Sequence, residues 1–492
     1  MLHNPATGAP LRTVADLDAG ALRELAARAR SAQPDWAGLG FDGRAKVLRR
    51  LAGWLVEHRE RAIETIVLET GKAYEDAQLL EIGYTLSALS FWASHAPRYL
   101  RERRAIVRSP LLAGRRVITR WEPRGLVGVI GPWNYPLLNS FGDAIPALAA
   151  GNCVLLKPSE LTPLTSLMIA QGLRECGLPD GVFAVATGGA ATAEALIDLV
   201  DFVMFTGSTA TGRQVAERCG RALIPCSLEL GGKDAMIVLE DAPLERAANV
   251  AVYYGMVNAG QSCVSIERVY VQASVHDEFV ARVTEKVRAL RVGAPRGPGS
   301  VDVGAITAPE QLTVIEAHVA DALARGARVA VGGARAPGPG TFYEPTVLLG
   351  VDHTMRCMVE ETFGPTLPVM AVAAAEQAIA LVNDSPMGLG AAVFAGDLGR
   401  GEAIARRIEA GAVCVNDAAV NYFALQAPMG GLRDSGIGVR HGPEGIRKYC
   451  TPRTIVLTPR VGVPRREPQM YPYTRGSARL VRTLLALLYR RR

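Results

Sequence analysis

The sequence predicts an α/β protein that contains a doubly wound parallel sheet, a second α/β domain and a small β element. The chain has 492 residues, which is too long for a single hydrophobic core. From Gly125 onward, short apolar runs alternate with helical stretches, the pattern of parallel strands joined by crossover helices. The 51 glycines and 30 prolines suit the many short connections of such a fold.

The first 106 residues are expected to be helical. Apolar residues recur at helical spacing over 16–32, 42–70 and 75–95. Gly71 is expected to end the second helix, and Pro97 follows the third. By contrast, residues 117–121 alternate in polarity, which predicts an exposed strand that pairs outside its own domain.

Two α/β series follow. The first has expected strands at 126–130, 153–156, 182–186, 202–205 and 227–230, with helices at 136–150, 163–176, 190–199 and 211–219. The second has expected helices at 242–258, 276–290 and 309–325, with strands at 269–271, 329–331, 346–349, 367–370 and 391–394. No motif is shared between the two series, so they are two domains of similar style and not an internal repeat.

The composition excludes several function classes. The net charge is +6, but residues 451–492 carry +9, which leaves −3 for residues 1–450 and argues against a nucleic-acid-binding body. The eight cysteines form no CxxC pair and no HExxH occurs, so neither a disulfide framework nor a metal site is expected. No signal pattern and no apolar run of about 20 residues is found, so a cytoplasmic protein is expected.

A cysteine in a polar, glycine-containing loop is the candidate nucleophile. The loop Asn258-Ala259-Gly260-Gln261-Ser262-Cys263 lies between an apolar run and the expected strand at 269–271. A thiol in such a loop can face a ligand, and its thiolate is a strong nucleophile.

Three motifs follow expected strands, at the sheet edge where α/β proteins bind ligands. Gly131-Pro132-Trp133-Asn134 offers an amide that can stabilise an oxyanion. Lys157 and Glu160 can together hold two ribose hydroxyls. Thr206-Gly207-Ser208 offers hydroxyls at a helix N-terminus, where phosphate binds well.

Two further motifs supply acids. Glu229 ends a strand and precedes Gly231 and Gly232, whose flexibility would let a general base reach its water. Glu361 stands two residues before Phe363, which places a carboxylate beside an aromatic ring. Taken singly, each motif also fits an ordinary cap, turn or solvated charge.

Together, in this order and at these separations, the six stretches resemble the NAD(P)-dependent aldehyde dehydrogenase superfamily. The resemblance runs from Asn4 to about Tyr449 and includes a closing Pro428-Met429-Gly430-Gly431 segment, with Met429 where phenylalanine is common. It implies an aldehyde dehydrogenase-like fold with the following parts. An NAD-binding domain spans 1–106 and 125–231, a catalytic domain spans 232–428, oligomerisation strands span 107–124 and 449–460, and a basic tail spans 461–492.

The resemblance also implies roles for individual residues. Cys263 matches the nucleophile, Glu229 the general base and Asn134 the oxyanion-stabilising amide. The matching cofactor-binding residues are Trp133, Lys157, Glu160, Thr206, Gly207, Ser208, Glu361 and Phe363. Such an enzyme oxidises an aldehyde to the acid through a thiohemiacetal and a thioester. Glu160 favours NAD because an acid repels a 2′-phosphate, although Lys157 could tolerate NADP.

The substrate is expected to be an apolar aliphatic or aromatic aldehyde. The chain looks most like a bacterial branch labelled succinate-semialdehyde dehydrogenase. Members with that activity carry two arginines for the substrate carboxylate, and this chain has Val257 and Gly142 at those positions. Leu137 and Leu138 also suggest an apolar mouth. The alternatives are succinate semialdehyde, a CoA-acylating enzyme of the same fold, which Glu229 argues against, and a catalytically silent binding or structural protein.

The partners expected are a small aldehyde and further copies of the chain, as a homodimer or homotetramer joined through the strands near 117–121 and 453–458. Residues 477–492 combine arginines with an apolar side and are too short to span a bilayer. Such a helix either lies on an anionic membrane or packs on a neighbouring subunit, and the sequence leaves both open.

Overall fold

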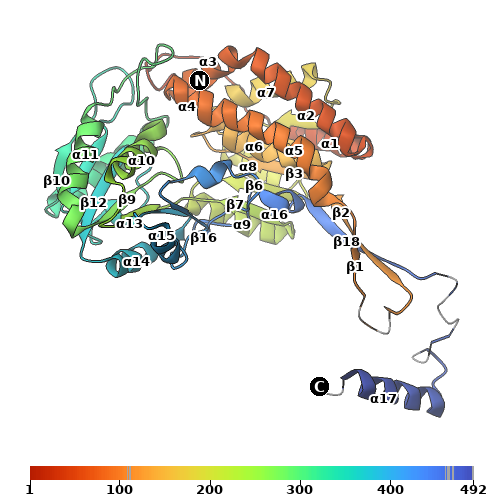
Figure 1. The fold of residues 1–492 in the computed structure, drawn as a ribbon. Coiled ribbons are helices and arrows are strands. Elements are labelled where there is room, and N and C mark those ends of the chain that lie inside the picture. Colours follow the sequence, from red (N-terminus) through yellow and green to blue (C-terminus); the bar gives the residue numbers. More distant parts are fainter. Residues whose placement is uncertain (108, 110–111, 460, 462–465, 468–469, 490–492) are drawn as a thin grey trace. The chain divides into compact units, whose positions relative to one another are not determined.

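The computed structural model describes residues 1–107, 109, 112–459, 461, 466–467 and 470–489 (Figure 1). Contacts between Cα atoms divide the chain into two compact units. The first contains residues 1–100 and 123–451, and the second contains residues 101–122 and 452–492.

Helices cover much of the N-terminal region and both sheets of the first unit. Their bounds are α1 Ala19–Gly38, α2 Gly40–Glu57, α3 Arg59–Thr70, α4 Tyr74–Asp76, α5 Tyr84–Leu100, α6 Gly142–Ala150, α7 Leu164–Glu175, α8 Ala190–Ile197 and α9 Thr209–Ala222. The later helices are α10 Leu244–Met256, α11 His276–Arg288, α12 Pro309–Ala324, α13 Arg356–Val359, α14 Ala375–Asn383, α15 Leu398–Ala405 and α16 Gly442–Arg447. Two π-helical segments, Ala77–Gly83 and Pro136–Phe141, run directly into α5 and α6.

Two predicted N-terminal helices differ from the observed ones. The expected helix at 42–70 is broken at His58, whose ring stacks on Trp54 with 4.3 Å between ring centroids. Gly71 ends α3 as predicted, in the left-handed conformation at φ 71°. Helix α5 continues through Pro97, which has no N–H to donate to Ala93; the free carbonyl of Ala93 accepts a hydrogen bond from Arg49 instead.

The first sheet has six strands in the order β17-β7-β6-β3-β4-β5. Their bounds are β3 Leu126–Ile130, β4 Cys153–Lys157, β5 Phe183–Val185, β6 Phe202–Thr206, β7 Cys226–Glu229 and β17 Gly436–Ile437. All neighbours are parallel except β17 on β7. The chain moves outward through β4 and β5 and then returns to the other side of β3 through β6, so the strand order reverses between β3 and β6. Ligands bind at such a reversal in doubly wound sheets.

The second sheet has seven strands in the order β10-β11-β12-β9-β8-β14-β15. Their bounds are β8 Ala235–Val238, β9 Arg268–Gln272, β10 Arg328–Val331, β11 Thr346–Leu349, β12 Thr366–Val372, β14 Gly390–Phe394 and β15 Ala412–Val415. Only β10 runs antiparallel to its neighbour. A two-stranded pair, β13 Met387–Gly388 with β16 Leu432–Arg433, lies outside both sheets. The predicted α/β class with parallel sheets is confirmed.

The second unit contains most of a three-stranded sheet in the order β1-β2-β18, and the helix α17. The strands are β1 Arg103–Ala105, β2 Arg116–Pro123 and β18 Cys450–Leu457, and α17 is Arg475–Tyr489. Most side chains of β18 are exposed, as are those of α17. Within the described residues, no helix has both the length and the apolar character needed to cross a membrane.

Candidate active site

Cys263 lies in a strained loop that precedes β9 in the second sheet. Asn258, Ala259 and Gly260 all adopt left-handed backbone conformations, with φ between 52° and 71°. Such angles cost energy in residues that have a Cβ, and the cost is met by specific contacts. The Asn258 N–H donates to Asp76 at 2.9 Å, which fixes the start of the turn.

The glycine and glutamine before Cys263 have structural reasons to be there. A Cβ on Gly260 would lie 2.0 Å from the carbonyl oxygen of Gly364, so only glycine lets these two loops meet. The buried Gln261 amide donates to Asn258 at 2.8 Å and to Ala305 at 3.1 Å, and its oxygen accepts from the Thr307 N–H at 2.8 Å. The loop is therefore tied down on three sides.

Asn134 follows β3, and a buried ion pair holds its backbone carbonyl. The Lys72 ammonium contacts the Glu81 carboxylate at 2.6 Å, both side chains being fully buried, and donates to the Asn134 carbonyl at 2.8 Å. Glu81 also accepts the N–H groups of Leu137 and Leu138 at 2.9 and 3.0 Å. The Asn134 amide nitrogen donates to the carbonyl of Gln261 at 2.9 Å, which places this amide beside the Cys263 loop.

Glu229, at the end of β7, is buried, and its Oε1 has no hydrogen-bond partner among the described residues. Burial raises the pKa of Glu229 to about 7, against the opposing charges of Arg440 and Lys448. A carboxyl group with this pKa can both take up and release a proton near neutral pH.

Burial likewise raises the pKa of the Cys263 thiol to about 12, against the charge of Arg440. The thiol therefore keeps its proton at neutral pH in this structure and needs a base in order to attack. Cys263 and Glu229 both line one cavity of about 850 Å³.

Glu361 and Phe363 precede β12 and face the same cavity. Glu361 accepts the N–H of Gly232 at 2.9 Å, and burial raises its pKa to about 8. Phe363 has φ 52°, and its ring meets Trp133 edge-on with 5.5 Å between centroids. Glu267 holds this loop, since its carboxylate accepts the N–H groups of Thr362 and Phe363 at 2.8 and 2.9 Å.

The remaining predicted cofactor residues lie at ends of first-sheet strands. Thr206, Gly207 and Ser208 line the 850 Å³ cavity, and Ser208 caps α9 by accepting the N–H of Thr211. Lys157 and Glu160 do not line it; they contact each other at 3.3 Å, and Glu160 lines a separate hollow of about 980 Å³. A further hollow of about 910 Å³ lies between α8 and α9.

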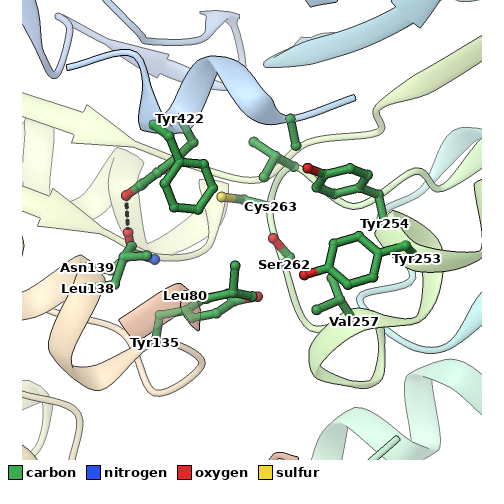
Figure 2. Close-up of a pocket in the computed structure, with 13 residues that line it drawn as sticks. Leu80, Tyr135, Leu138, Asn139, Tyr253, Tyr254, Val257, Ser262, Cys263 and Tyr422 are labelled. Atoms are coloured by element: carbon green, nitrogen blue, oxygen red, sulfur yellow. Dashed lines mark hydrogen bonds between the residues drawn. The ribbon is translucent and has the colours of Figure 1, made fainter. Parts of the chain in front are cut away.

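A second cavity, of about 490 Å³, lies on the other side of Cys263 (Figure 2). Its lining residues are Leu80, Tyr135, Leu138, Asn139, Tyr253, Tyr254, Val257, Ser262, Cys263, Val264, Ala419, Tyr422 and Phe423. Figure 2 shows the sulfur of Cys263 pointing toward Tyr422, with Tyr253 and Tyr254 on the opposite wall. The lining includes no Asp, Glu, Lys, Arg or His. Leu137, expected at this mouth, is fully buried and absent from the lining.

The residues predicted from sequence are thus largely brought together. Nine of them line the 850 Å³ cavity: Trp133, Asn134, Thr206, Gly207, Ser208, Glu229, Cys263, Glu361 and Phe363. The supporting residues Lys72, Glu81, Asp76, Glu267 and Arg440 were not singled out from the sequence. Glu81 could have been noticed in the sequence because it is an acid inside an apolar helical repeat. Among the tyrosines that line the 490 Å³ cavity, only the adjacent pair Tyr253-Tyr254, shortly before the Cys263 loop, could have been noticed in the sequence.

The residues around the 850 Å³ cavity fit NAD(P). Trp133 and Phe363 line it with two aromatic rings in edge-on contact, and the Glu361 carboxylate and the Ser208 hydroxyl offer polar groups of the kind that sugar hydroxyls and phosphates bind. Gly207 and Gly231 also line this cavity, and a Cβ on either would lie 2.6 Å from the Phe205 ring or from the Glu361 carboxylate.

Known proteins place this architecture in a family. The chain matches the aldehyde dehydrogenase family over residues 1–455. It is 41% identical over 467 residues to a Mycobacterium ulcerans protein named "Putative succinate-semialdehyde dehydrogenase", with NADP(+) in the name, covering 93% of this chain and 89% of that one. It is 39% identical over 477 residues to the 4,4'-diapolycopene aldehyde oxidase of a Methylomonas species, covering 95% and 87%.

A solved structure agrees with these sequence matches. The aldehyde dehydrogenase of Mycobacterium tuberculosis, complexed with NAD+, superposes with a TM-score of 0.87 at 35% identity, covering 93% of this chain and 94% of that one. This chain therefore belongs to the aldehyde dehydrogenase family and is an enzyme that oxidises an aldehyde with NAD(P).

Proposed function

We propose that Cys263 is the nucleophile of this oxidation, with Asn134 and Glu229 as its catalytic partners. Solvent water takes up the proton of the Cys263 thiol, and the resulting thiolate attacks the aldehyde carbon. The Asn134 amide, next to the Cys263 loop, donates to the oxyanion that forms. NAD(P), when bound in the cavity lined by Glu361 and Phe363, would supply the acceptor for the hydride of the aldehyde carbon. Glu229 then takes a proton from water, which hydrolyses the thioester and returns the acid and free Cys263.

The proposed cofactor contacts follow the strand ends of the first sheet. Lys157 and Glu160 would hold the adenosine ribose, Thr206, Gly207 and Ser208 the pyrophosphate, and Glu361, Phe363 and Trp133 the nicotinamide end. We propose NAD over NADP because the carboxylate of Glu160 repels a 2′-phosphate. The NADP(+) in the name of the M. ulcerans relative favours the other cofactor.

We propose an apolar aldehyde as the substrate, and the uncharged cavity beside Cys263 is the observation that carries this choice. Val257 is 8% exposed in that wall, and the tyrosines add apolar surface. A Cβ on Gly142 would lie 3.1 Å from the Tyr84 ring, so that position has no room for an arginine that could bind a carboxylate. Burying an anion without such a partner is unfavourable. The diapolycopene-oxidising relative is named for an apolar aldehyde.

We expect kcat/KM to be at least about tenfold higher for decanal than for succinate semialdehyde. Losing about 1.4 kcal/mol of carboxylate pairing corresponds to a tenfold lower kcat/KM. The measurement is the formation of reduced nicotinamide, followed by its absorbance, as NADH when NAD is supplied and as NADPH when NADP is supplied. We expect the higher kcat/KM with NAD.

Val257→Arg and the size control Val257→Leu test the same wall. Only the arginine variant is expected to gain activity on succinate semialdehyde. A wild-type enzyme that prefers succinate semialdehyde would contradict the apolar assignment, and a higher kcat/KM with NADP would contradict the cofactor assignment.

The sequence-based division into domains stands as a further proposal: cofactor binding in 1–106 and 125–231, and nucleophile delivery from 232–428. We also propose that the chain forms homo-oligomers through the sheet β1-β2-β18, whose outer strand β18 is largely exposed.

We propose that α17 is a helix that docks onto another surface. Val481, Leu484, Leu485 and Leu488 follow one another at helical spacing, while Arg475, Arg479 and Arg482 occupy another side. Such a helix suits an anionic membrane or a second subunit.

Removal of residues 475–492 is expected to leave the NADH-forming rate unchanged. If the helix binds membrane, the full chain sediments with phosphatidylglycerol vesicles and the shortened chain does not. Sedimentation of neither chain, with a lower mass of the shortened chain by light scattering, would assign the helix to the subunit contact instead.

A further inference from the structure

Arg440 is a buried cation for which the reaction described above has no role. It lies after the closing Ser435-Gly436-Ile437-Gly438 segment and is 3% exposed. Its guanidinium pairs with both carboxylate oxygens of Asp143, at 3.0 and 2.8 Å. A two-point contact of this kind fixes the position of the charge as well as neutralising it.

The remaining donors of Arg440 reach residues on both sides of the reaction centre. One donates to the hydroxyl of Tyr422 at 3.1 Å, and Tyr422 forms a wall of the apolar cavity. Another donates to the hydroxyl of Thr206, which lines the cofactor cavity. Thr206 is the register partner of Glu229 between β6 and β7, so Arg440 contacts the strand that adjoins the proposed base.

The position of Arg440 matters because of its electrostatic effect on Glu229. Its buried Oε1 accepts no hydrogen bond among the described residues, so nearby charge must offset the cost of keeping it ionised. Arg440 is the foremost opposing charge, followed by Lys448, whereas Asp143 acts in the other direction. Besides the effect of burial, the negative charge of Glu229 in turn acts to raise the pKa of its neighbours Cys263, Tyr84, Lys448 and Tyr449.

We propose that Arg440, fixed by Asp143, is a positioning residue that keeps the Glu229 carboxylate ionised in the cavity that Cys263 also lines, and that it thereby sets the pH range of thioester hydrolysis. The proposal rests on Glu229 being the base that activates water. Arg440 itself acts through Glu229 and needs no contact with substrate.

The test is the pH dependence of kcat in Arg440→Gln and Arg440→Lys. Loss of the charge is expected to move the acidic limb upward by about one pH unit, because an opposite charge near a carboxylate lowers its pKa by about that much or more. Turnover of Arg440→Gln at pH 7 should then fall about fivefold, since the ionised fraction of Glu229 drops from about one half to about one tenth, and it should recover at higher pH. Arg440→Lys retains a charge and should keep the limb near that of wild type.

Two further variants separate this role from a merely structural one. Arg440→Gln with Asp143→Asn leaves no unpaired buried charge, so it protects folding, and its limb should still move upward by a smaller amount. In a Glu229→Gln background, where the limb should be absent, Arg440→Gln should add no pH dependence to the residual steady-state turnover. An unchanged limb in both the single and the paired variant, with a lowered Tm in the single variant, would overturn the proposal.

A limb that persists in Glu229→Gln and moves upward when Arg440→Gln is added would also overturn the proposal, since Arg440 would then act through Cys263. The two hypotheses fail separately. Wild-type turnover in Glu229→Gln alone would remove Glu229 as the base, whereas a wild-type limb in Arg440→Gln would remove only the role of Arg440.

Discussion

Cys263→Ala is expected to lower NADH formation from any aldehyde by roughly 10⁴-fold or more, because no other group can form the covalent intermediate. The side chain is small and half-buried in a loop whose shape depends on Asp76, Gln261 and Gly260. Removing the sulfur therefore leaves the loop intact, and Tm should change little. The measurement is single-turnover NADH formation together with thermal unfolding.

Cys226→Ser is the matched control for this variant. Cys226 is also half-buried, but it begins β7 and lines neither cavity beside Cys263. It should retain wild-type turnover. A Cys263→Ala enzyme that still forms NADH at the wild-type rate would refute covalent catalysis at this site.

Glu229→Gln is expected to separate the two halves of the reaction. Hydride release does not need a base for water, so a burst of NADH equal to the enzyme concentration should remain. Hydrolysis of the thioester does need it, so steady-state turnover should fall by about 10²–10⁴-fold. Rapid mixing measures the burst, and intact-protein mass spectrometry detects the acyl group trapped on Cys263.

The wild-type pH profile follows from the same carboxyl group. Burial raises the pKa of Glu229 to about 7, and only the ionised form acts as base. Turnover limited by hydrolysis should therefore fall as the pH drops through about 7, and this limb should be absent in Glu229→Gln. The surface variant Glu57→Gln serves as control and should keep the limb. Loss of the burst together with turnover in Glu229→Gln would contradict a role confined to hydrolysis.

The strand ends of the first sheet show which features of the site are predictable locally. The apolar runs at 126–130, 202–205 and 227–230 mark buried parallel strands, and the polar residues after them must lie at one sheet edge. The sequence alone is enough to assign Asn134, Thr206 and Glu229 to that edge. The break at His58 was missed because stacking on Trp54 leaves no mark in the apolar periodicity.

The second sheet contributes to the site from the edge at which its parallel strands begin, whereas the first sheet contributes from the edge at which its strands end. Cys263 precedes β9, and Glu361 and Phe363 precede β12, which is the neighbour of β9. These residues stand before their strands, whereas the first-sheet residues stand after theirs. The rule that ligands bind at the carboxyl edge would therefore not have found them, and only the loop motifs pointed to them.

By itself, the sequence determined the α/β class, the strand-end motifs and the residue types that the chemistry needs, because periodicity and loop composition are local properties of the chain. Tertiary structure alone decided which distant groups meet. Arg440 pairs with Asp143 across 297 residues, Lys72 supports Asn134 across 62, and Tyr422 faces Cys263 in one cavity wall. The energy of a buried charge or an apolar wall depends on every element packed around it, and no local window of sequence contains that information.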